Sequence, residues 1–119
     1  IEAKEHGFQN AMLFNSEGDI IEASNSNIFV IKDNIIYTPP IEDGCVDGTM
    51  RNLICNLFHV INKSVSLELI KKADEVFISN SINGVIPINK IGVCSYTSHI
   101  FSNMIQGKLI SLIQDLPED

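Results

Sequence analysis

The sequence predicts an α+β domain built on a mostly antiparallel sheet. Short runs rich in β-branched residues, such as 27–32 and 35–38, are separated by turn residues, which is typical of antiparallel hairpins. Two longer stretches, near 48–62 and after Thr97, carry apolar residues at helical spacing. The chain has no internal repeat, low-complexity tract or linker, so we expect residues 1–119 to form one domain.

Size and charge exclude several classes of protein. A chain of 119 residues with 45% hydrophobic content can bury the core of one ordinary domain. A net charge of −7 argues against a nucleic-acid partner, because phosphates require a basic surface. No run approaches the roughly 18 apolar residues of a membrane span, so no membrane partner is expected. The three cysteines lack metal-type spacing and predict reduced thiols in a cytoplasmic protein.

The first half of the chain predicts two hairpins. Their four strands are Asn10–Asn15, Asp19–Ser24, Asn27–Lys32 and Ile35–Thr38. The second hairpin turns at Asp33-Asn34, a pair that tolerates positive φ. Pro39 and Pro40 then end the strand, because proline cannot donate to a sheet.

The second half predicts helices alternating with strands. A helix over Gly48–Asn62 would place one apolar stripe on the core, made by Met50, Leu53, Ile54, Leu57 and Ile61. Ser66 is expected to cap a short helix that ends at Lys72. The remaining elements are strands at Glu75–Ser79 and Val85–Ile91 and a last helix that starts at Thr97.

The first seven residues, IEAKEHG, have the pattern of the last turns of a helix. Lys4 and His6 suit the negative end of the helix dipole, and Gly7 suits a left-handed C-cap. We therefore expect further sequence upstream of Ile1.

Two features point to a ligand that carries a basic ring nitrogen and a phosphate. Glu22 is the one charged residue between Ile20 and Val30, and it is either a solvent-facing strand residue or a carboxylate partner for a ring nitrogen. Gly48-Thr49-Met50 opens a helix, and it is either a simple helix entry or a phosphate site made of backbone N–H groups. A carboxylate and an anion-binding helix start together suit pyridoxal phosphate (PLP).

Other polar residues are weaker candidates. Ser81 follows a buried strand, where its hydroxyl is either part of a turn or a further phosphate donor. Arg51 is interpreted as an exposed cation or a structural ion pair, and otherwise as a residue that supports the residues of the site without contacting the ligand. His59 and His99 are expected on helices without spaced ligands, and no metal is predicted. The seven lysines all have solvated positions, so none is a convincing Schiff-base lysine.

The order of these features resembles the C-terminal domain of the fold-type IV PLP enzymes. The resemblance rests on AMLFNSEGDIIEASNSNIFVIKDNIIYTPP, GCVDGTMR and ADEVFISNSINGVIPINKI, and it covers about Asn10 to Ile91. It implies the larger domain of the D-amino acid aminotransferase-like fold, with a mostly antiparallel sheet (a partial barrel) and flanking helices. It also implies PLP as the cofactor and a homodimer.

The resemblance assigns four cofactor-binding residues. Glu22 would meet the pyridine nitrogen, the backbone N–H groups of Thr49 and Met50 would hold the phosphate, and Ser81 would add a hydroxyl. No catalytic residue is assigned, because the lysine that forms the aldimine lies upstream of this sheet in the family. The N-terminal domain would be missing too, so this chain alone is expected to be inactive.

Within the group, the chain is most similar to 4-amino-4-deoxychorismate lyase, which releases 4-aminobenzoate and pyruvate in folate synthesis. Many aminotransferases have Ile-Thr before the arginine, whereas Thr49-Met50 precedes Arg51 here. Two alternatives stay open. The chain could be the same portion of a branched-chain or D-amino acid aminotransferase, or a non-catalytic domain that retains the fold.

Overall fold

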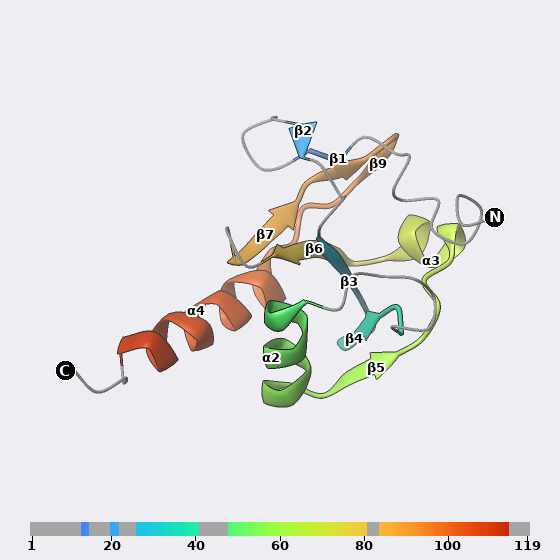
Figure 1. Cartoon of the computed structure of the whole chain (residues 1–119). Coiled ribbons are helices and arrows are strands. Elements are labelled where there is room, and N and C mark those ends of the chain that lie inside the picture. Colours follow the sequence, from blue (N-terminus) through green and yellow to red (C-terminus); the bar gives the residue numbers. More distant parts are fainter. Residues whose placement is uncertain (1–12, 15–19, 22–25, 41–47, 81–83, 115–119) are drawn as a thin grey trace.

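The computed structural model describes residues 13–14, 20–21, 26–40, 48–80 and 84–114. Its strands form a five-stranded sheet in the order β5-β4-β3-β6-β7 and a smaller sheet in the order β2-β1-β8-β9 (Figure 1). The strands are β1 Leu13–Phe14, β2 Ile20–Ile21, β3 Asn27–Lys32, β4 Ile35–Thr38, β5 Val60–Asn62, β6 Glu75–Asn80, β7 Gly84–Ile88, β8 Lys90–Ile91 and β9 Cys94–Ser95. The helices are α2 Thr49–Leu57, α3 Leu67–Lys72 and α4 Ile100–Gln114.

The predicted class is confirmed: this is an α+β structure in which all strand pairs except β4 and β5 are antiparallel. The expected sheet was a partial barrel. The described strands form two open sheets, and they do not close into a barrel. The β1–β2 pair lies inside the first predicted hairpin, whose remaining residues are outside the described ranges, as is the helix predicted over 1–7. No described helix has the length and apolar character needed to cross a membrane.

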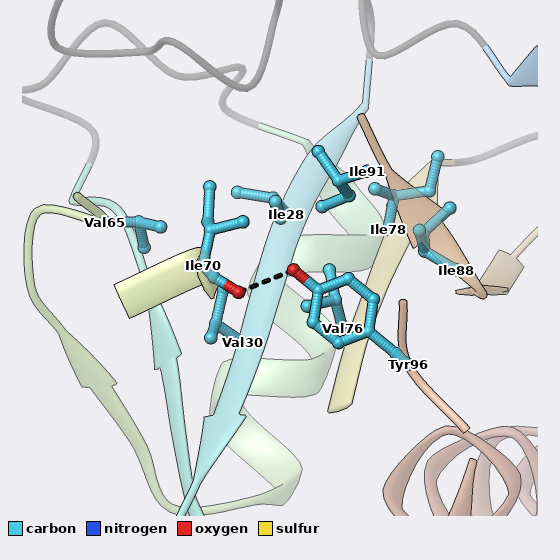
Figure 2. Packing of buried hydrophobic residues seen from close by; sticks show 9 residues of the cluster. All are labelled: Ile28, Val30, Val65, Ile70, Val76, Ile78, Ile88, Ile91 and Tyr96. Atoms are coloured by element: carbon cyan, nitrogen blue, oxygen red, sulfur yellow. Dashed lines mark hydrogen bonds between the residues drawn. The ribbon is translucent and has the colours of Figure 1, made fainter. Parts of the chain in front are cut away.

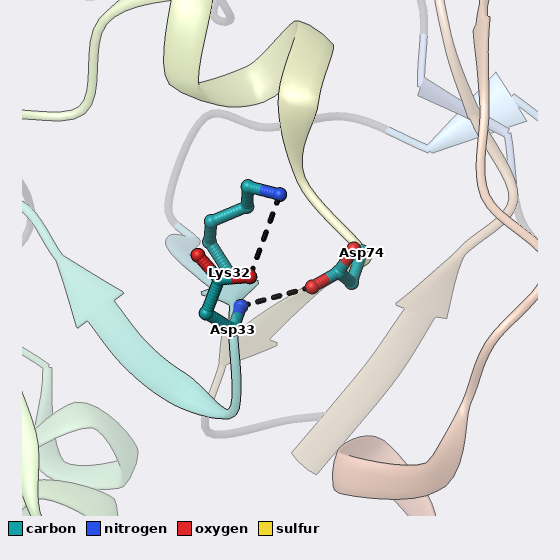
Figure 3. A network of polar contacts seen from close by, with 3 residues as sticks. All are labelled: Lys32, Asp33 and Asp74. Carbon is teal, nitrogen blue, oxygen red and sulfur yellow. Dashed lines mark hydrogen bonds and ion pairs between the residues drawn. The ribbon is translucent and has the colours of Figure 1, made fainter.

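The second hairpin is confirmed residue by residue. β3 and β4 pair antiparallel around Asp33 and Asn34, whose φ angles are 53° and 65°. Asp74, which directly precedes β6, stabilises this turn, because its carboxylate accepts a 2.9 Å hydrogen bond from the Asp33 N–H (Figure 3). Lys32 lies 3.7 Å from the Asp33 carboxylate in the same group. β4 ends at Thr38, directly before the two prolines.

The helix predicted over Gly48–Asn62 is too long. α2 ends at Leu57, Phe58 is extended, and Val60–Asn62 is β5, which pairs parallel with β4. Ile61 therefore lies on a strand and not on the helix stripe. The β-branched pair Val60-Ile61 suits an edge strand, and the free edge of β4 supplies the backbone partners.

The C-terminal part follows the predicted order with different bounds. The Ser66 cap is confirmed, since its hydroxyl accepts from the Leu69 N–H at 3.1 Å. The strand predicted over Val85–Ile91 divides at Asn89 into β7 and β8, which belong to different sheets. β9 was not predicted at all.

The last helix begins at Ile100 and not at Thr97, because its cap comes from another element. Glu75, at the start of β6, is 1% exposed and accepts hydrogen bonds from the N–H groups of Phe101 and Ser102 at 2.9 and 2.7 Å. Its carboxylate also accepts from the Ser102 hydroxyl at 2.7 Å. A carboxylate at the positive end of a helix is favourable, so Glu75 determines where α4 starts.

The large sheet is covered on both faces. One face packs on α3 and the small sheet, in a cluster made by Ile28, Val30, Val65, Ile70, Val76, Ile78, Ile88, Ile91 and Tyr96 (Figure 2). The other face packs on α2 and α4, in a cluster made by Phe29, Ile31, Ile36, Ile54, Phe77, Val85, Ile105 and Leu109. Alternate residues of β3 and β6 thus face opposite layers, as the period of a strand requires. Figure 1 shows α2 and α4 on the same side.

Candidate functional site

The first turn of α2 offers unpaired backbone donors. The first backbone bond of the helix runs from the Asn52 N–H to the Gly48 carbonyl at 3.1 Å, so the N–H groups before Asn52 have no partner within the helix. Gly48 provides no side-chain cap, and the first turn contains no acidic residue. Thr49 is exposed and Met50 is half-buried. This end of α2 can therefore accept an anion.

The other two described helices are already closed at this end. The start of α3 is capped by Ser66 and has Glu68 in its first turn. The start of α4 is occupied by the Glu75 carboxylate. Among the helices described, α2 is the one whose start shows neither a side-chain cap like that of Ser66 nor a bound carboxylate like that of Glu75.

Two polar residues lie beside this helix start. Asn27 of β3 and Ser79 of β6 are opposite each other in the strand register, and they are 3% and 0% exposed. They belong to the alternate positions that face α2 and α4, together with Phe29 and Phe77. Sequence analysis overlooked both residues. The signal was present, because each is a polar residue that alternates with a core-facing phenylalanine of its strand, Phe29 in β3 and Phe77 in β6.

The interpretation of Arg51 as an exposed cation is wrong. Arg51 is 5% exposed, and its Nη2 donates to the Pro39 carbonyl at 3.1 Å and to Asn62 Oδ1 at 2.5 Å. These bonds tie the first turn of α2 to the ends of β4 and β5. Arg51 therefore holds the helix start in place instead of facing solvent.

The remaining predicted residues fall into two groups. Glu22 and Ser81 lie outside the described residues, although Glu22 directly follows β2 and Ser81 directly follows β6 in sequence. The two histidines predicted on helices are not there, since His59 lies between α2 and β5 and His99 precedes α4, with its Nε2 2.6 Å from Asn89 Oδ1. Within the described ranges, no three His, Cys, Asp or Glu residues form a group suited to a metal ion.

The described lysines and cysteines agree with the sequence expectations. Five lysines, Lys63, Lys71, Lys72, Lys90 and Lys108, are exposed, and Lys32 is partly exposed beside Asp33. Cys55 and Cys94 are free thiols. Burial raises the pKa of Cys55, and the nearby Arg51 guanidinium opposes this effect. A raised pKa leaves less reactive thiolate at neutral pH, so Cys55 fits a structural thiol.

The geometry fits the phosphate of a phosphorylated cofactor. Backbone donors at an uncapped helix start and a nearby hydroxyl are the groups that bind phosphate in proteins. Two buried polar atoms have no hydrogen-bond partner in the described structure: Ser79 Oγ and Arg51 Nε, the latter in the first turn of α2. A buried unsatisfied group of this kind is uncommon and is a sign of a functional site.

Comparison with known proteins places the chain in a family. The amino-transferase class IV family matches residues 1–91. A branched-chain-amino-acid aminotransferase of Pseudomonas aeruginosa is 36% identical over 95 residues, which are 76% of this chain and 31% of that protein. The chain thus spans about a third of the length of the curated relatives it matches.

Solved structures give the same result. A putative 4-amino-4-deoxychorismate lyase from Legionella pneumophila has a TM-score of 0.71 at 28% identity, over 85% of this chain and 40% of that one. The branched-chain amino acid aminotransferase from Escherichia coli has a TM-score of 0.72 at 25% identity, over 85% of this chain and 37% of that one. The family match covers most of the sequence, and the fold agrees with it. The chain therefore belongs to the amino-transferase class IV family.

Proposed function

We propose that this chain forms the cofactor-holding part of a PLP-dependent enzyme that acts on an amine substrate. The start of α2 is the observation that carries the proposal, because the first backbone donors of the helix have no partner within it and its first turn contains no acidic residue. The other described helix starts are closed by Ser66 and Glu75. Membership of the class IV family supports the same assignment, since the family resemblance implies PLP.

Each proposed ligand residue has a separate task. The N–H groups of Thr49 and Met50 bind the phosphate at the positive end of α2, and the Ser81 hydroxyl donates a further hydrogen bond. The Glu22 carboxylate keeps a proton on the ring nitrogen. When bound, PLP supplies an electron sink that stabilises negative charge on the substrate carbon next to the amine. The roles of Glu22 and Ser81 rest on the sequence resemblance alone.

The reaction we propose is that of 4-amino-4-deoxychorismate lyase, which yields 4-aminobenzoate and pyruvate. Thr49-Met50 before Arg51 supports this choice, because many aminotransferases of the group have Ile-Thr there. The likeness to the Legionella pneumophila structure supports it as well.

An aminotransferase is the second candidate. It is favoured by the 36% identity to the Pseudomonas aeruginosa branched-chain enzyme. The two reactions share the cofactor site and differ in the substrate pocket.

The deciding experiment assays the full-length protein with both kinds of substrate. Release of 4-aminobenzoate and pyruvate from aminodeoxychorismate supports the lyase. Transfer of an amino group to 2-oxoglutarate from a branched-chain or D-amino acid supports the aminotransferase. A protein that binds PLP and does neither reaction is the non-catalytic domain, and the proposed enzyme is then wrong.

Glu22→Gln tests the ring-nitrogen assignment in the full-length enzyme. The change removes the charge that holds the ring proton, so we expect kcat to fall by about 10²-fold. PLP affinity should change little, because the phosphate is held by Thr49 and Met50. Steady-state kinetics and PLP titration measure the two effects, and unchanged turnover would show that Glu22 is an ordinary strand residue.

A further inference from the structure

Asn27 and Ser79 are polar residues at one end of the face of β3 and β6 that packs on α2 and α4. The alternate positions of β3 that face α2 and α4 are Asn27, Phe29 and Ile31, and those of β6 are Glu75, Phe77 and Ser79. Glu75 is explained by its bonds to α4. Asn27 and Ser79 lie at the opposite end of the same two strands, and of these two residues Ser79 has no hydrogen-bond partner in the described structure. We call them the Asn27–Ser79 pair.

The Asn27 side chain lies directly against the start of α2. A Cβ atom built on Gly48 would be 3.0 Å from Asn27 Oδ1, which is closer than ordinary contacts of a Cβ. Asn27 is 3% exposed and is paired with Ser79 of β6 at the first position of β3, so its buried side chain has little room to move away. The contact therefore sets how near the helix start can come to the strand.

Ser79 is an independent sign that this place receives a ligand. Its Oγ has no hydrogen-bond partner in the described part of the chain, and the residue is 0% exposed. An unpartnered buried hydroxyl destabilises a protein, so its retention requires another reason. Because Ser79 lies opposite Asn27 in the strand register, the two side chains share the sheet face that packs on α2.

We propose that the Asn27–Ser79 pair forms the base of the phosphate site and binds the phosphate monoester class of ligand. Asn27 is a positioning residue, which fixes the start of α2 and so the N–H groups of Thr49 and Met50. Ser79 provides a hydroxyl donor to the phosphate. Charge-assisted hydrogen bonds need short distances, so a displacement of the N–H groups by a few tenths of an ångström weakens the binding of the anion. This inference rests on the proposed function, since it deepens the description of the same site.

The first experiment compares PLP with pyridoxal, which lacks the phosphate, on the full-length protein. Gly48→Ala forces the helix start away from Asn27, and we expect PLP affinity to fall about tenfold with little change for pyridoxal. Asn27→Ser in the Gly48→Ala background relieves the contact and should restore PLP affinity to within about threefold of wild type. Gly107→Ala is the matched control, because nothing lies within 4 Å of the added Cβ on α4.

The second experiment uses Ser79→Ala. PLP affinity should fall about fivefold while pyridoxal affinity is unchanged. The unfolding midpoint of the ligand-free protein should stay the same or rise, because the deleted hydroxyl has no partner in the described structure. A purely structural hydroxyl would instead lower the unfolding midpoint and leave the preference for PLP intact. This variant also keeps the proposal testable where Gly48→Ala fails to fold.

The outcomes separate this inference from the proposed function. A wild-type protein that binds PLP no better than pyridoxal has no phosphate site, and the proposed function fails. A wild-type preference for PLP, combined with equal losses for both ligands in Gly48→Ala and no effect of Ser79→Ala, overturns the role of the Asn27–Ser79 pair alone. Failure of Asn27→Ser to restore PLP affinity overturns the positioning role.

Discussion

Arg51 shows how one buried side chain can fix the position of a helix start, here the start of α2 in the candidate site. Its Nη2 donates to the Pro39 carbonyl and to Asn62 Oδ1, so a single group joins the first turn of α2 to two strand ends. Burial of a guanidinium is costly unless its hydrogens find acceptors. Arg51 therefore serves to hold the start of α2 in position and does not act as a surface charge.

Arg51→Met should destabilise the fold. Methionine keeps an apolar stem of similar reach but removes the hydrogen bonds to the Pro39 carbonyl and to Asn62 Oδ1, and we expect a loss of about 2–4 kcal/mol in the free energy of unfolding. Urea denaturation measures this loss. Lys71→Met, at an exposed position of α3, is the control and should change stability by less than about 0.5 kcal/mol. Equal effects of the two substitutions would contradict the structural role of Arg51.

The residues of the candidate site could be placed in the fold from the sequence only where local signals define them. Thr49 and Met50 were placed at a helix start because Gly48 and the apolar spacing after it identify that start. Asn27 and Ser79 were missed because their meaning depends on a cross-strand register. A single sequence does not give that register, and the same holds for the partners of Arg51.

At the scale of elements, local and distant determinants separate in the same way. The hairpin of β3 and β4 was predicted in full, because β-branched runs and an Asp-Asn turn act over a few residues. The end of α2 was wrong because the edge of β4 draws Val60–Asn62 into a strand. The start of α4 was wrong because Glu75, far away in sequence, supplies its cap.

Glu75→Gln tests whether a strand residue determines the start of α4. The amide keeps the shape but loses the charge and one acceptor oxygen, so we expect a loss of about 1–3 kcal/mol in unfolding free energy. Faster hydrogen exchange at Phe101 and Ser102 should accompany it. Glu68→Gln is the matched control, since Glu68 pairs with Lys72 at 2.9 Å on the surface and should matter by only about 0.5 kcal/mol. Similar losses in both variants would argue against the Glu75 cap.

At the scale of the whole molecule, Tyr96 links the two sheets through the layer that contains α3. Its hydroxyl donates to the Ile70 carbonyl at 2.5 Å, and its ring lies in the cluster between α3 and the small sheet (Figure 2). The pKa of Tyr96 is raised, first by burial and then by the neighbouring Cys94. The folded protein therefore holds this proton more tightly than the unfolded chain does.

This linkage predicts a loss of stability in alkali. The contribution of Tyr96 is fully present below the unfolded tyrosine pKa of about 10 and decreases as the pH rises above it. Tyr96→Phe should lower stability by about 1 kcal/mol at neutral pH, because the Ile70 carbonyl loses the shorter of its two hydrogen bonds and keeps only that from the Ala73 N–H. It should also flatten the decline in stability above pH of about 10. Denaturation at a series of pH values measures both effects, and an unchanged alkaline slope would contradict this prediction. Tyr37→Phe, on the partly buried β4 position, is a suitable control.

The parallel pairing of β4 with β5 has a consequence for how the protein folds. The two strands are joined through α2, and Arg51 connects the ends of all three elements. These contacts close only a short loop of chain, whereas β6 reaches β3 from much further along the sequence. Short loops close at lower entropic cost, so this unit should form early in the folding reaction. Substitutions at Arg51 should then slow refolding, while substitutions at Glu75 should mainly accelerate unfolding.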